Sequence, residues 1–122
     1  MEELVGRVVA AAGIERTVAE RAIGIILDFL ATEAPPDNVA NLLAHLPGAA
    51  EAIEAARAGA GGEMFGGMGG IMGAGNRLMS VGLDMGEMQH VAHELIAYAR
   101  EKAGDKNLDD IVAAIPGLSQ FI

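Results

Sequence analysis

Four side chains between positions 87 and 94 are those whose types and spacing could do chemistry. Glu87 and His90 stand three residues apart, His93 follows after three more, and Glu94 is next to it. On a helix this spacing puts carboxylate and imidazole on neighbouring turns, as in bundles that hold di-iron carboxylate sites. Such a site also needs a second Glu-x-x-His, which this chain does not contain. We therefore expect a solvated polar face and no cofactor here, with Glu87, His90 and His93 kept as candidate metal ligands.

Other stretches that resemble ligand-binding or catalytic loops fail at their defining positions. Asp105-x-Asn107-x-Asp109 begins like a calcium loop, but Asp110 stands where that loop needs glycine. The glycine-rich residues 58–75 lack the third glycine of a dinucleotide fingerprint and the lysine of a Walker motif. The chain has no cysteine, and neither of its serines lies in a nucleophile elbow. We expect no catalytic residues and no enzymatic activity.

The glycine- and methionine-rich stretch itself is the remaining candidate for function. One interpretation is a flexible linker whose methionines fill gaps between the parts that it joins. The other is an adaptable apolar surface for a partner helix or a lipid, since methionine-rich faces adapt to varied ligands. The candidate interaction residues are Met64, Phe65, Met68, Met72 and Met79.

The sequences on the two sides of this stretch resemble each other. At an offset of 69 residues, positions 1–53 align with positions 70–122 without a gap, and residues 54–69 connect them. Most identical pairs fall where helices are expected to start or stop: Gly13/Gly82, Asn38/Asn107, Pro47/Pro116 and Gly48/Gly117. Two such units, each with an apolar face to cover, predict one helical domain with pseudo-two-fold symmetry.

The hydrophobic periodicity predicts an all-helical fold. Apolar residues recur at helical spacing in each unit, and only 3% of the residues are aromatic, so the core is built from small and aliphatic side chains. Thr17 with Glu20, Asp84 with Glu87, Asn38 and Asn107 are the expected helix N-caps. The predicted helices cover residues 2–12, 17–34, 38–46, 49–58, 71–81, 84–103 and 107–115, and the second should be central.

The charge and composition limit the partners. A net charge of −9 argues against nucleic acids, which require clustered lysine and arginine. Membrane association is unlikely on the same ground, and no apolar run reaches the roughly 20 residues of a membrane span. The acidic N-terminus does not resemble a secretory signal, so we expect a cytoplasmic protein. A mean hydropathy of +0.34 suggests that a second copy covers part of the apolar surface, which predicts a homo-oligomer, most simply a dimer, or a complex with a partner protein.

The short sequences at which the helices of the two units are expected to stop or start also resemble known proteins. Ala44-His45-Leu46-Pro47-Gly48, Ala113-Ala114-Ile115-Pro116-Gly117 and Gly82-Leu83-Asp84, with the Gly/Met/Leu linker, are similar to bacterial all-helical families of unknown function, the YidB-like and VcgC/VcgE-like groups. The likeness spans most of the chain. It implies a helical fold, and it transfers no catalytic residues.

Overall fold

The computed structural model describes residues 2–59, 70–115 and 117–120, and these residues form helices and no strand. The all-helical prediction is therefore confirmed. None of the helices in the described part of the chain has the length and apolar character needed to cross a membrane. The helices are α1 (Glu2–Ala12), α2 (Arg16–Glu33), α3 (Pro36–Ala44), α4 (Ala49–Gly59), α5 (Gly70–Ser80), α6 (Met85–Ala103), α7 (Asp105–Ala114) and a 3-10 helix (Leu118–Gln120).

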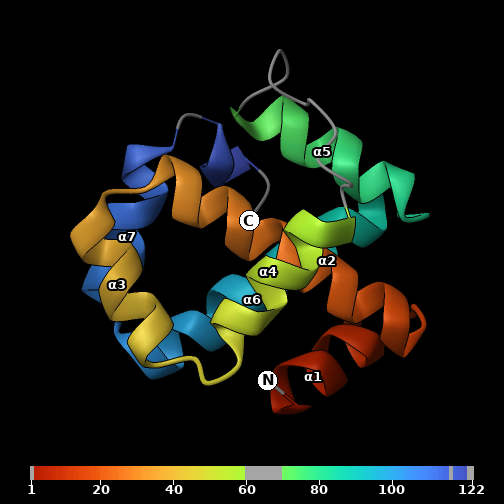
Figure 1. Cartoon of the computed structure of the whole chain (residues 1–122), viewed down its shortest axis with the longest axis horizontal. Helices are drawn as coiled ribbons and strands as arrows, with labels where there is room; N and C mark the ends of the chain where they lie inside the picture. Colours follow the sequence, from red (N-terminus) through yellow and green to blue (C-terminus); the bar gives the residue numbers. More distant parts are fainter. Residues whose placement is uncertain (1, 60–69, 116, 121–122) are drawn as a thin grey trace.

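Helix α2 lies at the centre and contacts α1, α3, α4, α5 and α6. Figure 1 shows α4 crossing in front of it, with α1 and α5 on opposite sides. Every residue from Ala22 to Leu30 is buried, so this part of the helix is covered on all sides. A helix that is apolar around its whole circumference belongs in a core. The prediction of a central second helix is confirmed.

Gly24 allows α4 to approach α2 closely. A Cβ atom at this position would lie 2.5 Å from the backbone oxygen of Ala52 on α4, a distance that real Cβ atoms essentially never show. The α4 residues on this side are small or aliphatic, with Ala49 and Ile53 buried and Ala52 and Ala56 partly buried. The absence of a side chain at Gly24 therefore sets how near the two helix axes come.

The turns that follow the first helix of each unit match the prediction. Gly13 and Gly82 both have positive φ angles, +68° and +102°, which glycine adopts without steric cost. Asp84 caps α6: its side chain accepts a hydrogen bond from the backbone N–H of Glu87, whose carboxylate accepts one from the backbone N–H of Asp84. The predicted box at Thr17 and Glu20 is wrong, because α2 begins at Arg16 and Glu15 makes no side-chain cap.

The prediction that Asn38 and Asn107 are N-caps is also wrong. Helix α3 begins two residues before Asn38, at Pro36, whose fixed φ suits the first turn, and α7 begins at Asp105 directly after Gly104. The two asparagines instead bond to each other across α3 and α7. Asn38 Nδ2 donates to Asn107 Oδ1 at 2.7 Å, and Asn107 Nδ2 donates to the Asn38 carbonyl at 3.3 Å.

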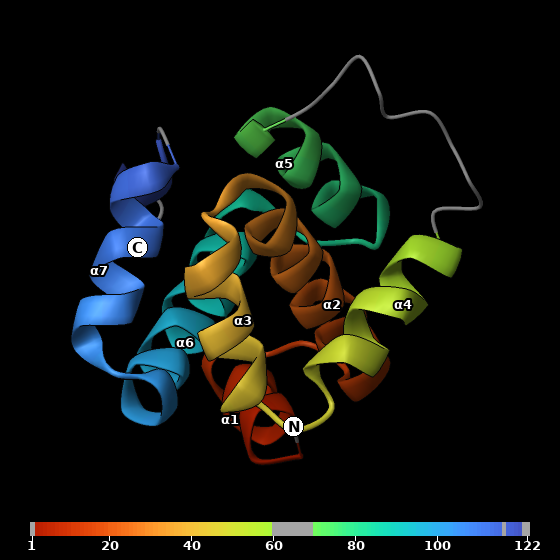
Figure 2. The same cartoon turned by 60° about the vertical axis from the view of Figure 1, so that its left-hand side comes forward.

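The contacts between helices correspond pairwise at the offset of 69 residues. Helices α1, α2 and α3 align with α5, α6 and α7; α1 packs on α6, α5 packs on α2, and α3 packs on α7. Figure 2 shows α7 at the left of the molecule, with α6 and then α3 to its right and α1 below them. The first helix of each unit thus contacts the long helix of the other unit. The pseudo-two-fold arrangement of two repeats stays a prediction.

The close approach at Gly24 gives a test of this packing. We expect Gly24→Ala to lower the free energy of unfolding by about 1–3 kcal/mol, because the backbone of α4 must move away. Gly6→Ala and Gly75→Ala are matched controls, since no atom lies within 4 Å of a Cβ added at either position. Both controls should stabilise their helices by roughly 0.5–1 kcal/mol. Urea unfolding followed by circular dichroism measures all three, and a stabilised Gly24→Ala variant would contradict the close packing of α2 and α4.

Candidate functional site

Glu87, His90 and His93 lie on α6, but their surroundings differ from those of a metal site. The Glu87 carboxylate is engaged in the capping box with Asp84. His90 and His93 are both exposed. Within residues 2–59, 70–115 and 117–120, no three His, Asp or Glu side chains come close enough together to hold a metal ion.

The exposed position of the two histidines has a physical reason. At the offset of 69 residues, His93 aligns with Gly24, the position where α4 crosses α2. In the described part of the second unit, the helix that follows α7 is the 3-10 helix Leu118–Gln120, and it contacts α7. On the described part of α6, the side chains of Gln89, His90 and His93 are exposed. An imidazole suits this solvated face, whereas it would block a helix crossing like that at Gly24.

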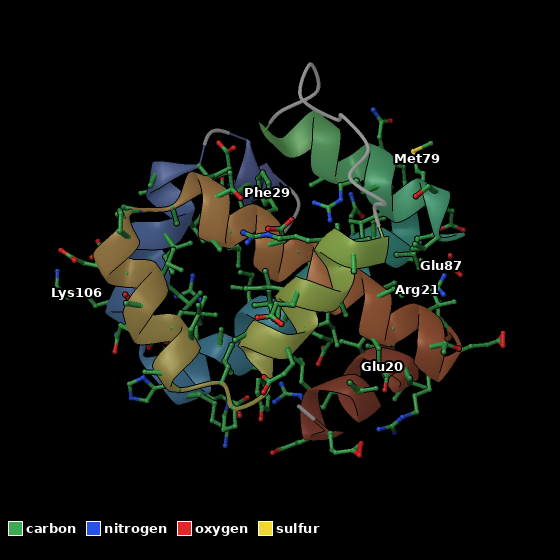
Figure 3. The ribbon with its side chains drawn as sticks, in the orientation of Figure 1. Glu20, Arg21, Phe29, Met79, Glu87 and Lys106 are labelled. Carbon is green, nitrogen blue, oxygen red and sulfur yellow. The ribbon has the colours of Figure 1, made fainter. Side chains whose placement is uncertain are left out.

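Of the predicted interaction residues, Met79 has a described and exposed side chain, with 57% of its surface accessible. Figure 3 shows it pointing outward from α5, at the same edge of the molecule as Glu87 of α6. Met72 belongs to α5, but its side chain lies outside the described part of the structure, as do Met64, Phe65 and Met68. The structure adds Met85, the first residue of α6, which is also 57% exposed.

Met79 and Met85 flank one turn, and the other unit shows that this turn does not need them. Each stands three residues from Gly82, and among the described residues they are the exposed large hydrophobic side chains. The aligned residues of the first unit are Ala10 and Arg16, beside the equivalent turn at Gly13. The same helix-turn-helix is thus built with a small and a charged residue. The two methionines, which we call the methionine corner, are therefore not explained by the fold.

A buried charge cluster joins α2, α4 and α5. Asp28 is 7% exposed; its Oδ1 accepts from Arg57 Nε and its Oδ2 from Arg77 Nη1, both at 2.8 Å. Arg77 Nη2 also donates to the carbonyl of Ala56, near the end of α4, at 3.4 Å. The sequence analysis missed this cluster. Its signal was an acidic residue inside the otherwise apolar run Ala22 to Leu30, because a buried carboxylate requires partners.

A second group of charges joins α1 to α6. Arg7 bonds to Glu101 at 3.1 Å and to Glu94 at 3.4 Å, and its guanidinium lies 5.4 Å from the centre of the Tyr98 ring. Partial desolvation lowers the pKa of Arg7, but the hydrogen bonds and charges of Glu101 and Glu94 outweigh it, so the pKa lies above its ordinary value. Arg7 is thus a fixed positive charge that holds α1 on α6. Glu94, adjacent to the candidate ligand His93, is engaged in this contact.

The roles of Glu87 and the histidines can be separated by stability. We expect Asp84→Ala to cost about 1 kcal/mol and Glu87→Ala about 0.5 kcal/mol, because each removes a capping hydrogen bond. His90→Ala and His93→Ala should change the free energy of unfolding by less than about 0.5 kcal/mol, since both side chains are exposed. Urea unfolding with and without EDTA checks this. An EDTA-dependent loss that disappears in His90→Ala would instead indicate a metal site.

The comparisons with known proteins do not add to this picture. No protein-family model, no curated protein and no solved structure matches this chain. The resemblance to the YidB-like and VcgC/VcgE-like groups therefore stays a prediction.

Proposed function

We propose that this chain is a non-enzymatic interaction protein that self-associates through the methionine corner. The observation that carries the proposal is the difference between the two aligned turns. Methionine side chains are exposed at the turn between α5 and α6, where the equivalent turn between α1 and α2 has Ala10 and Arg16. Exposed methionine is costly in water and adapts its shape to a partner surface.

The charge distribution argues against nucleic acids and anionic lipids as partners of this surface. The chain carries 17 acidic and 8 basic residues, and several of the arginines are held in ion pairs within the chain, including Arg7, Arg16, Arg57, Arg77 and Arg100. An outer surface with this balance repels phosphate backbones and anionic lipids. Two thioether side chains also offer little apolar area to a lipid surface, and lipid binding scales with that area.

Binding of an apolar ligand or a lipid is the alternative function. It would use the same methionines, together with Met64, Phe65, Met68 and Met72. A protein partner is favoured because Met79 and Met85 lie beside polar residues, including Asp84 and Ser80, which suit the rim of a protein interface. A cytoplasmic location belongs to the same proposal.

The oligomeric state as a function of concentration tests the proposal. We expect the wild-type chain to form dimers at high protein concentration, with an affinity that rises with salt because salt screens the repulsion between copies of net charge −9. The double variant Met79→Gln/Met85→Gln should weaken dimerisation at least tenfold. Light scattering coupled to size-exclusion chromatography and sedimentation velocity provide the measurements.

The aligned turn supplies the matched control. Ala10→Gln places the same polar side chain at the exposed position of the first unit that aligns with Met79 and leaves the net charge unchanged, so dimerisation should stay within about twofold of the wild type. A wild-type chain that is strictly monomeric at millimolar concentration would reject self-association. Equal dimerisation by the methionine variant and the wild type would reject this surface. Co-sedimentation of the wild-type chain with phosphatidylcholine vesicles, lost in the methionine variant, would favour the lipid alternative.

A further inference from the structure

The charged residues Asp28 and Arg77 occupy positions where the aligned residues of the other unit are apolar. At the offset of 69 residues, Asp28 aligns with Ala97 of α6 and Arg77 aligns with Val8 of α1, which is fully buried. At the aligned positions, α6 and α1 thus carry an alanine and a valine, where α2 and α5 carry an ion pair. The charges are therefore an addition to a contact that apolar residues can make.

The described part of α5 buries few apolar side chains. Among its described side chains, Ala74 and Leu78 are the buried apolar ones. Apolar contacts are non-directional, so these two residues by themselves fix the position of α5 on α2 only weakly.

The ion pairs of Asp28, unlike the apolar contacts, depend on the orientation of the groups that form them. Each carboxylate oxygen of Asp28 accepts a hydrogen bond from a different helix, and Arg77 also contacts the α4 carbonyl of Ala56. Charged hydrogen bonds of this kind depend strongly on geometry, because the guanidinium is planar and rigid. One displacement of α5 along α2 would break both of these hydrogen bonds of Arg77, to Asp28 and to the Ala56 carbonyl.

We propose that Asp28, Arg57 and Arg77 form a positioning cluster. The cluster selects one position and orientation of α4 and α5 on α2, and it contributes little to the free energy of unfolding. Replacing a buried ion pair by well-packed apolar residues often leaves the free energy of unfolding unchanged. The best-attested role of such pairs is to select one packing arrangement of the parts that they join. Met79 lies two residues after Arg77 on the same helix, so the cluster also sets where the methionine corner is presented.

The aligned residues define the decisive variants. Asp28→Ala alone should lower the melting temperature by roughly 10 °C, because Arg77 is left nearly buried without its carboxylate. The double variant Asp28→Ala/Arg77→Val, which copies Ala97 and Val8, should recover to within a few degrees of the wild type. Arg57, whose side chain is 60% exposed, is then left in solvent at little cost.

Amide hydrogen exchange distinguishes an effect on the position of α4 and α5 from an effect on the stability of the whole fold. In the double variant, amide hydrogen exchange in α4 and α5 should be about tenfold faster or more than in the wild type, with α1 and α6 unchanged. The control Arg100→Gln/Asp109→Asn removes an ion pair on α6 and α7 and should leave exchange in α4 and α5 as in the wild type. Wild-type exchange in α4 and α5 of the double variant would overturn the proposal, as would a melting temperature as low as that of Asp28→Ala. Neither result depends on whether the chain self-associates.

Discussion

The complete burial of the middle of α2 is the constraint on which the rest of the structure depends. With few aromatic residues, the chain cannot build its core from bulky rings, so it surrounds one largely aliphatic helix with five of the other described helices. Each neighbour must then approach closely, which is why a glycine stands at the crossing with α4. Any polar group on the buried stretch of α2 must find its partners on those neighbours, as Asp28 does.

The aligned helices α1 and α5 each pack on the long helix of the other unit, but different side chains make the two contacts. Helix α1, which packs on α6, buries Leu4, Val5 and Val8. Arg7 adds ion pairs to Glu94 and Glu101 of α6. Helix α5 has fewer buried apolar residues among its described side chains, and it has an ion pair with Asp28 from its last turn. The pair of asparagines joins α3 and α7 at their aligned positions. The helix contacts thus correspond between the two units, whereas the side chains that make them differ.

The sequence predicted well what depends on local patterns. Helical periodicity, the glycine turns at Gly13 and Gly82 and the capping box at Asp84 are set by neighbouring residues, and all are confirmed. The roles of Asn38 and Asn107 were mispredicted because a tertiary contact outcompeted a local cap. The partners of Asp28 come from positions 29 and 49 residues away, so composition and spacing could not reveal them. Exposure of Met85 likewise depends on how α6 packs.

Arg57 and Arg77 stand on the two helices that residues 60–69 join, and both bind the same carboxylate. The two helices are therefore tied to a common point on α2 by a single carboxylate. A movement of either helix is thereby coupled to the other through Asp28, although the two arginines lie 20 residues apart in the sequence.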